Sequence, residues 1–280
     1  MDQTMKRWLL RGGSTALAVA LLVCFMLLHS CRNQPSEPTE PPTTQYTLPP
    51  SAYTPEDFVF DGDYLSCTAG DTVLGIDVSS HLGEIDWQQV AGAGVEFVFV
   101  RLAYRGYSSG TLNPDEYARI NLNGAREAGI AVGAYLYSQA ISVAEAEEEA
   151  RYALEMLDGF QLDLPLVYDW EYVSDTARTA NVDARTLTDC TLAFCEAVEE
   201  AGCEAMIYFN SSQIMDLLYG GELEQYPWWL AKYDLAMEFP CQADLWQYTN
   251  QGTVPGITGV VDIDLMFTDY GLGQVFAQVP

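Results

Sequence analysis

The sequence predicts an α/β fold in which eight strands, most of them followed by a helix, close into one barrel. Short apolar runs alternate with helical patterns from Asp71 onward, which is typical of a parallel sheet covered by helices. Eight such strands fall within about 205 residues, which suits a single barrel whose last helices are reduced. An open, doubly wound sheet is the alternative.

The first 31 residues are predicted to be a signal peptide or a membrane anchor. Three basic residues precede a nearly uncharged apolar run from Ser14 to Leu28, the order found in export signals. This run is shorter than the roughly 20 residues that span a membrane as a helix. The ending Leu-His-Ser-Cys resembles a bacterial lipoprotein processing site and makes Cys31 the predicted lipidation site. Histidine is unusual there, so an uncleaved anchor stays open, and we expect the protein outside the cytoplasm, membrane-anchored or secreted.

A linker is predicted for residues 32–55, where seven of the chain's 13 prolines lie among Thr, Ser and Glu. Such a composition buries too little apolar surface to fold. Residues 56–70 are a lead-in segment, and residues 71–280 form the barrel domain. We expect the linker to hold this domain away from a membrane.

The elements of the barrel follow from the spacing of apolar residues. Strands are predicted at 73–77, 95–104, 130–138, 164–171, 204–210, 228–234, 243–249 and 261–267. Helices are predicted at 84–94, 114–129, 142–157, 183–202 and 211–220. Ser142 and Glu145 have the spacing of a capping box, which indicates a helix start.

Charge and cysteine content exclude several classes of function. Beyond Cys31 the chain has nine basic and 39 acidic residues, a net charge of about −30. This charge repels phosphate backbones, so no nucleic-acid partner is expected; we expect a soluble monomeric domain. The domain's cysteines are odd in number and lack metal-type spacing, so their disulfide state is left open. They are Cys67, Cys190, Cys195, Cys203 and Cys241.

The stretch LVYDWEY (166–172) places two carboxylates at the end of an apolar strand. Asp169 and Glu171 are two residues apart, so they project from one face, roughly 6–7 Å apart along the chain. Crowding of this kind raises the pKa of one carboxyl and leaves the other ionised, which acid–base catalysis uses. A strand that ends in a solvated acidic loop is the simpler alternative.

Further carboxylates lie on the first and eighth predicted strands. Asp77 ends the first strand, and Asp262 and Asp264 lie in the eighth. These strands are neighbours in a closed barrel, and barrel active sites lie at the carboxyl ends of strands. We therefore expect the acids of these strands to converge on Asp169 and Glu171.

Counting residue types narrows the chemistry. His81 is the domain's one histidine, which excludes a His-rich zinc site, and we expect it in a loop beside the cleft. No metal or cofactor is predicted, although a magnesium or calcium site built from the same acids stays open. Reactions run by two carboxylates without a metal are dominated by glycoside hydrolysis.

Aromatic residues where strands end favour a carbohydrate cleft. The flat C–H faces of sugars pack on aromatic rings, while sugar hydroxyls bond polar side chains; singly, each ring is more often core packing. The candidate substrate contacts are Arg101, Tyr137, Tyr208, Asn210, Trp229, Trp246 and Asp264.

Six blocks of the sequence, in order, resemble glycoside hydrolase family 25, the secreted lysozymes of the muramidase kind. The blocks are LGIDVSSHLGEIDW, GVEFVFVRLAYRG, GIAVGAYLYSQA, LPLVYDWEY, WWLAKYD and DLWQYTNQGTVPGITGVVDIDLMF, which together run from about Gly75 to Phe267. The resemblance implies an irregular, flattened (β/α)8-like barrel as a single catalytic domain. It implies peptidoglycan glycan strands as partner and cleavage of the β-1,4 bond between N-acetylmuramic acid and N-acetylglucosamine.

The resemblance also assigns the cleft carboxylates to Asp77, Asp169, Glu171 and Asp262. It aligns the first acid of Val-Asp-x-Asp with the cleft, whereas position alone would favour Asp264. We expect Glu171 to act as general acid and then as base. Asp169 either attacks the sugar or assists its N-acetyl group, and Asp77 and Asp262 orient substrate and tune charge.

Two alternatives remain at this point. One is a wall-binding lipoprotein that has kept the fold without catalysis. The other is a chitinase-like hydrolase of another N-acetylated glycan, since Asp-Trp-Glu-Tyr also occurs in family 18 chitinases. Their signature is Asp-x-x-Asp-x-Asp-x-Glu, and here its earlier positions hold Leu164 and Val167, so only half of it is present.

Overall fold

The computed structural model describes residues 50–210, 218–233 and 242–276. The predictions for residues 1–49, which include Cys31 and most of the linker, lie outside the described residues, as does Cys241. Most of the helix predicted at 211–220 is also outside them. Among the described residues, no helix is both long enough and apolar enough to cross a membrane.

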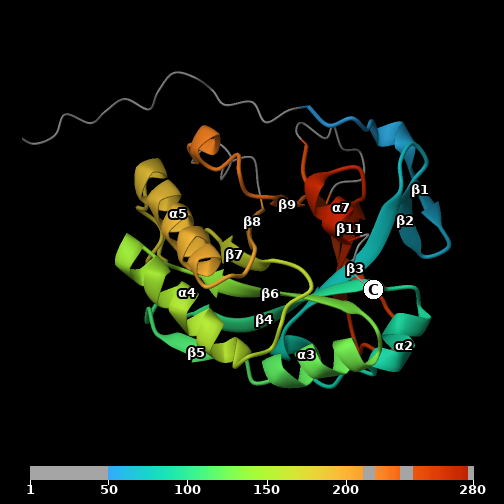
Figure 1. Cartoon of the computed structure of the whole chain (residues 1–280), viewed down its shortest axis with the longest axis horizontal. Coiled ribbons are helices and arrows are strands. Elements are labelled where there is room, and N and C mark those ends of the chain that lie inside the picture. Colours follow the sequence, from blue (N-terminus) through green and yellow to red (C-terminus); the bar gives the residue numbers. More distant parts are fainter. Residues whose placement is uncertain (1–49, 211–217, 234–241, 277–280) are drawn as a thin grey trace, which may run out of the picture. The chain divides into compact units, whose positions relative to one another are not determined.

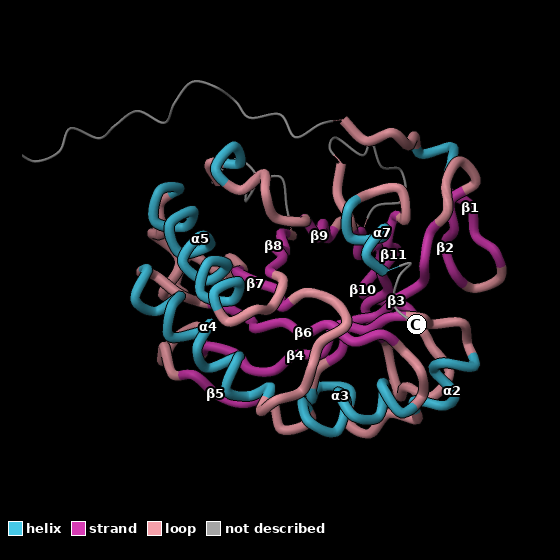
Figure 2. The backbone as a smooth tube through the Cα atoms, viewed as in Figure 1, coloured by secondary structure: helices cyan, strands magenta, loops and turns pink. Residues whose placement is uncertain are grey.

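Eight strands close into the predicted barrel, which confirms the fold class (Figures 1 and 2). The sheet order runs from β3 through β4, β6, β7, β8, β9, β10 and β11, and β3 pairs with both β4 and β11. The strands are β3 (Thr72–Val78), β4 (Phe97–Arg105), β6 (Ala131–Ser138), β7 (Leu166–Trp170), β8 (Ala205–Phe209), β9 (Trp228–Ala231), β10 (Leu245–Gly252) and β11 (Val261–Phe267). Each overlaps one of the eight predicted strands.

The last strand departs from the expected parallel barrel. β11 is antiparallel to both of its neighbours, β10 and β3, whereas the other strands of the barrel pair in parallel. The connection at 253–260 is shorter than the dozen or more residues that a parallel crossover needs, so β10 and β11 form a hairpin. The start of β11 therefore lies at the barrel end where the parallel strands finish.

The helices lie outside the strands (Figure 2). They are α2 (Trp87–Gly92), α3 (Ala118–Glu127), α4 (Val143–Leu157), α5 (Ala184–Glu200) and α7 (Gly271–Phe276), with 3-10 turns η1 (Pro55–Asp57), η2 (Ser80–Leu82) and η3 (Gly220–Glu222). The side chains of Asp86, Ser142 and Asp183 accept N-cap hydrogen bonds from the first turns of α2, α4 and α5. The Ser142 hydroxyl accepts from the Glu145 amide as the predicted capping box requires, but the Glu145 carboxylate accepts from the Ile141 amide instead of the Ser142 amide.

The helix predicted from residue 114 begins at Ala118 instead. The residues before it form a short strand, β5 (Leu112–Pro114), which pairs antiparallel with β4. The Asp115 amide then donates to the Leu102 carbonyl, which continues the attachment to β4. Backbone pairing with an available strand edge thus competes successfully with the start of the helix.

The lead-in segment is more ordered than the sequence indicated. Its strands β1 (Phe58–Asp61) and β2 (Tyr64–Cys67) form a hairpin on the side of the domain away from α4 and α5 (Figure 1). Phe58 packs edge-on against Trp246, and the Leu65 amide donates to the Tyr248 hydroxyl. The hairpin covers the outer face of β10. Tyr53, inside the predicted linker, is already buried.

Apolar residues fill both sides of the strands. The outer core lies between strands and helices, and the inner core fills the barrel around Phe97, Phe99 and Trp229. Gly75 and Gly133 leave room for these rings, since a Cβ there would lie within 2.1 Å of Phe97 and 2.3 Å of Phe99. The described cysteines are free: Cys190 and Cys195 are buried in α5, as predicted, and Cys67 and Cys203 are partly exposed.

Candidate active site

Four carboxylates meet at one end of the barrel. Asp77 lies near the end of β3 and is the direct cross-strand partner of Asp262 on β11. Asp169 lies on β7, and Glu171 follows β7 directly. Because β11 runs antiparallel, Asp262 at its start reaches the same end as Asp77 and Asp169, and Asp264 lies one step deeper. Position alone would favour Asp264 on a parallel strand, but β11 is antiparallel, so Asp262 lies nearer the end of the barrel where the other acids meet.

Burial raises the pKa of all four carboxyl groups. It raises the pKa of Glu171 to about 7 and that of Asp262 to about 6. Burial also raises the pKa of Asp77 and Asp169 well above their usual range, with Asp262 adding to the first and Glu171 to the second. For Glu171 the like charge that adds to burial is Asp262, not the expected Asp169.

Neutral polar side chains surround the carboxylate cluster and bond to its members. The Gln247 amide nitrogen donates to Asp77 Oδ2 at 2.5 Å. Its amide oxygen accepts from the hydroxyls of Tyr233, at 2.7 Å, and Tyr208, at 3.3 Å. Side-chain hydrogen bonds with Tyr208 and Asn210 lower the pKa of Glu171 and so oppose part of its shift. The cluster is therefore held by neutral side chains.

Four of the predicted substrate contacts join the carboxylates. Tyr137 and Tyr208 are the register partners of Asp169 on β6 and β8. Arg101 is close enough to lower the pKa of Asp169, although its Nε already pairs with Asp115 Oδ2 at 2.9 Å. Asn210 follows β8 beside Glu171.

Trp229 and Asp264 form a floor beneath these groups. Both are enclosed in the barrel, with exposures of 2% and 0%, and the Trp229 indole donates to Asp264 Oδ1 at 2.9 Å. Trp229 also packs edge-on against Tyr208, with ring centroids 5.0 Å apart. We therefore place these two residues in support of the site, without access to substrate.

The structure does not bring Trp246 to the site, so this predicted substrate contact needs correction. Trp246 is 1% exposed, belongs to the outer core and donates to the Lys232 carbonyl. Strand alternation explains the error, because Leu245 and Gln247 on β10 face the interior and their neighbour Trp246 faces outward. The same alternation identifies Gln247 as an interior polar residue.

Two further tyrosines lie near the carboxylates and were not among the predicted substrate contacts. Tyr135 is buried in the inner core, where Asp77 and Asp169 raise the pKa of its hydroxyl further than burial alone. Tyr233 follows β9 and is about half exposed. Tyr135 could have been found by its alternation with Tyr137 along β6, and Tyr233 by its alternation with Trp229 along the strand predicted at 228–234, although β9 itself ends at Ala231.

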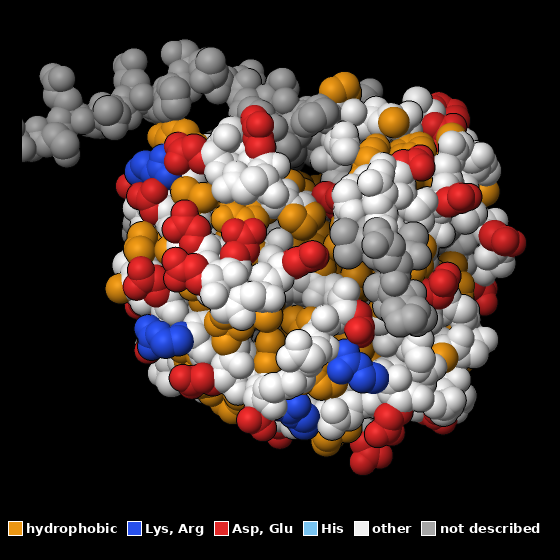
Figure 3. Space-filling view, in the orientation of Figure 1, with side chains coloured by type: hydrophobic (Ala, Val, Ile, Leu, Met, Phe, Trp, Pro, Cys, Tyr) orange, Lys and Arg blue, Asp and Glu red, His pale blue; other side chains and the backbone are white. Residues whose placement is uncertain are grey.

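His81 and the acids outside the cluster complete the electrostatic setting. His81 is exposed in η2, directly after β3, as predicted. On the face shown in Figure 3, acidic side chains outnumber basic ones. In the part of the chain that the structure describes, no group of three or more His, Cys, Asp or Glu residues is arranged to hold a metal ion.

The chain matches a known enzyme family. The sequence profile of glycosyl hydrolases family 25 matches residues 76–257. The chain belongs to this family and is by class a glycoside hydrolase.

Particular relatives are lysozymes or have no described activity. Lysozyme M1 of Streptomyces globisporus is 25% identical over 201 residues, 68% of this chain and 66% of that protein. The autolytic lysozyme of Clostridium acetobutylicum is 25% identical over 191 residues, 68% of this chain and 54% of that protein. The uncharacterized protein YegX of Escherichia coli K12 is 30% identical over 203 residues, 69% of each chain.

Solved structures share the barrel. The modular autolysin LytC of Streptococcus pneumoniae, in complex with a synthetic peptidoglycan ligand, has a TM-score of 0.60 and 29% identity. The match covers 70% of this chain but 47% of LytC, about half its length. A family 25 hydrolase of Bacillus anthracis matches with a TM-score of 0.60 and 22% identity over 73% of this chain and 91% of that chain, which shows the fold alone.

Proposed function

We propose that the protein is a peptidoglycan hydrolase that cleaves the β-1,4 bond between N-acetylmuramic acid and N-acetylglucosamine. The observation that carries this proposal is the convergence of Asp77, Asp169, Glu171 and Asp262 at one end of the barrel. The lysozymes among its relatives and the peptidoglycan ligand of LytC support the same substrate class.

Glu171 is the proposed general acid. It must be protonated to donate to the leaving glycosidic oxygen, and burial with Asp262 raises its pKa to about 7. After the bond breaks, the same carboxylate takes a proton from water. Tyr208 and Asn210 lower the pKa of Glu171 and so limit this rise.

Asp169 is the proposed partner on the other side of the reacting carbon. Its Oδ1 is buried and has no hydrogen-bond partner among the residues described, so a substrate group that donates there would relieve an unpaired polar atom. An N-acetyl N–H of the sugar is such a donor, which favours assistance to the N-acetyl group over direct attack. Arg101 supplies positive charge to the same carboxylate.

Asp77 and Asp262 are proposed to orient the substrate and to tune the charge. Asp77 is fixed by Gln247, and Asp262 raises the pKa of Glu171. Their roles are therefore electrostatic and positional.

The experiment is turnover on purified peptidoglycan, with analysis of the new reducing ends. We expect reducing N-acetylmuramic acid and a rate that falls as pH rises through about 7, where Glu171 loses its proton. Binding to the wall without new reducing ends would favour the non-catalytic alternative. Turnover on chitin with none on peptidoglycan would favour the chitinase-like one.

We also propose that the N-terminal segment carries the domain outside the cytoplasm and anchors it through lipid on Cys31. The autolytic lysozyme among its relatives supports a site of action beyond the cytoplasm. Incorporation of labelled fatty acid should be lost in Cys31→Ser. Equal labelling of the wild type and of Cys31→Ser would contradict lipidation at Cys31 and leave the uncleaved anchor as the alternative.

A further inference from the structure

The main-chain pairing that supports the site stops one residue before Glu171. The ladder between β6 and β7 ends at the pair Ser138–Trp170. Strand pairing fixes Asp169 within this ladder, but Glu171 lies beyond it. Another contact must therefore determine where the Glu171 backbone lies.

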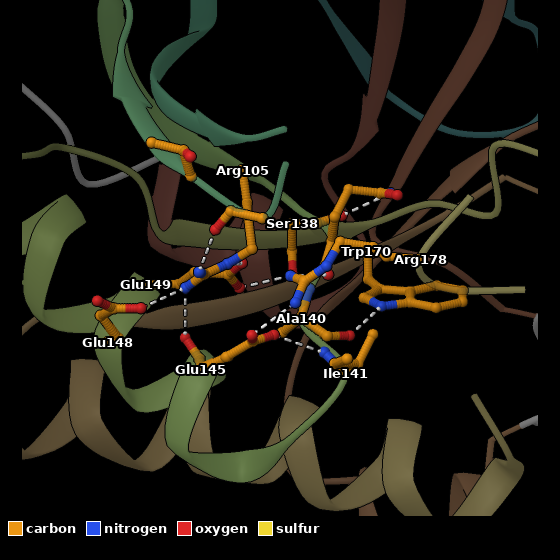
Figure 4. A network of polar contacts seen from close by, with 12 residues as sticks. Arg105, Ser138, Ala140, Ile141, Glu145, Glu148, Glu149, Trp170 and Arg178 are labelled. Atoms are coloured by element: carbon orange, nitrogen blue, oxygen red, sulfur yellow. Dashed lines mark hydrogen bonds and ion pairs between the residues drawn. The ribbon is translucent and has the colours of Figure 1, made fainter. Parts of the chain in front are cut away.

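Two side-chain hydrogen bonds continue the connection past the end of the ladder. The Trp170 indole donates to the Ala140 carbonyl at 3.0 Å (Figure 4). The Gln139 amide nitrogen donates to the Glu171 carbonyl at 2.6 Å and to the Ser138 carbonyl at 2.9 Å. Residues 170 and 171 are thus tied to residues 139 and 140.

Gln139 is itself held from both sides. Its amide oxygen accepts from the Thr179 hydroxyl at 3.2 Å, and its main-chain carbonyl accepts from Arg178 Nη1 at 2.9 Å. Arg178 in turn pairs with Glu145 at the start of α4, at 2.6 Å (Figure 4). The two donors of the Gln139 amide and its acceptor therefore all have partners, which leaves one orientation of the side chain.

We infer that Gln139 is a positioning residue for Glu171, and that Thr179 and Arg178 hold it in place. Gln139 is fully buried, so it acts through the Glu171 backbone and not on the substrate. The inference rests on the proposed role of Glu171 as the acid. A displacement of about 1 Å in a reacting group can lower a rate by roughly 100-fold, so the hydrogen bond matters more for turnover than for binding.

The test compares Gln139→Met with a matched control, Thr191→Val. Methionine keeps the length of the side chain but cannot donate to Glu171. The control also removes one buried side-chain hydrogen bond, from Thr191 to the Leu187 carbonyl inside α5, away from the site. Both variants should lower the melting temperature slightly, which separates stability from positioning.

In full-length protein acting on purified peptidoglycan, we expect Gln139→Met to lower kcat by roughly 10- to 100-fold with KM within twofold. The alkaline limb of its pH profile should also move, because the environment of Glu171 changes. In a Glu171→Gln background, the same change should have no further effect on kcat. Thr191→Val should leave kcat and the profile unchanged.

A wild-type kcat in Gln139→Met would overturn the inference. So would an equal loss of kcat when Gln139→Met is introduced into the wild-type protein and into Glu171→Gln. If the wild-type protein does not cleave peptidoglycan, the proposed function fails separately. Amide hydrogen exchange then decides: Gln139→Met should speed exchange in residues 171–180 by about tenfold while Thr191→Val does not. Unchanged exchange there would also overturn the inference.

Discussion

Acidic side chains gather in two regions of the domain and have different partners in each. In the cleft, Arg101 lowers the pKa of Asp169 but already pairs with Asp115, and no ion pair among the described residues involves a cleft carboxylate. Beside it lies a second group of acids on α4, with arginines committed to each of them (Figure 4). Arg105 pairs with Glu149 at 2.6 Å and with Glu148 at 2.8 Å, and Arg178 pairs with Glu145.

The difference indicates which acids serve structure and which serve chemistry. Glu149 also accepts from the Ser138 hydroxyl at 2.6 Å, so its buried charge is compensated from two directions. Burial raises the pKa of Glu149 to about 7 as well, so the two regions differ in their partners: among the described residues the cleft acids form no ion pair, a state that opposes folding and persists where function requires it. The cleft carboxylates can therefore hold a proton where a substrate could take it, whereas Glu149 on α4 is fully buried and cannot pass its proton to a substrate.

The largest expected effect is that of Glu171→Gln. The amide keeps the shape of the side chain but cannot donate the proton, so turnover on peptidoglycan should fall by roughly 10²–10⁴-fold. The variant should remain folded, with a melting temperature at or above that of the wild type at pH 8, because a buried carboxyl is removed. Near-normal turnover in a folded variant would contradict the assignment.

Arg105→Met should give the largest loss of stability. Both Arg105 and Glu149 are buried, and the substitution leaves the Glu149 carboxylate without its cation. Breaking such a pair typically costs about 3–5 kcal/mol, measurable by chemical denaturation. The double variant Arg105→Met, Glu149→Met should recover much of this loss, and no recovery would show that the pair is not the cause.

The variants Asp262→Asn and Asp264→Asn should distinguish a carboxylate that lines the cleft from one that is enclosed beneath it. Asp262 is half-buried beside Asp77, so its amide variant should turn over at least tenfold more slowly, about 1.4 kcal/mol of barrier. Asp264 is enclosed, and asparagine can still accept from the Trp229 indole. We expect turnover of Asp264→Asn within twofold of wild type. If Asp264→Asn instead lost more turnover than Asp262→Asn, then Asp264, and not Asp262, would be the cleft carboxylate of β11.

The smallest effect is a dependence of stability on pH. Folded-state pKa values near 7 for Glu171 and Glu149, and near 6 for Asp262, lie above the unfolded values of 4.5 and 3.8. Raised values mean that their stabilising contribution is complete below pH 4 and is lost as pH rises through about 6 to 7. Melting temperatures should therefore fall over this range.

The matched comparison for this pH dependence is Asp262→Asn with Glu171→Gln, set against the exposed control Glu116→Gln. The double variant should flatten part of the fall in melting temperature, and Glu149 should account for part of what remains. A control that flattens it equally would assign the effect to general charge repulsion.

Local patterns in the sequence were sufficient for the eight strands and for the starts of α4 and α5. Alternation along β7 placed Asp169 correctly because a strand's two faces are set by parity alone. The direction of β11 was missed although residues 253–260 are too few for a parallel crossover. Trp246 was misplaced because aromatic abundance was weighed ahead of the same parity rule.

The position of Gln139 could not be predicted in this way. Its contact with Glu171 joins the ends of two strands 32 positions apart in sequence, and no periodic pattern connects them. Likewise, the commitment of Arg101 to Asp115 depends on β5 pairing with β4, which replaced the expected start of a helix.

The polypeptide enters the domain at the pole opposite the carboxylates. Tyr53 stacks on Phe267, the last residue of β11, with ring centroids 5.1 Å apart, and its hydroxyl donates to Asp269 at 2.7 Å. Asp262 lies at the other end of that strand. A force applied to the chain at Tyr53 would therefore act on the end of β11 that lies opposite Asp262, and not on the carboxylates.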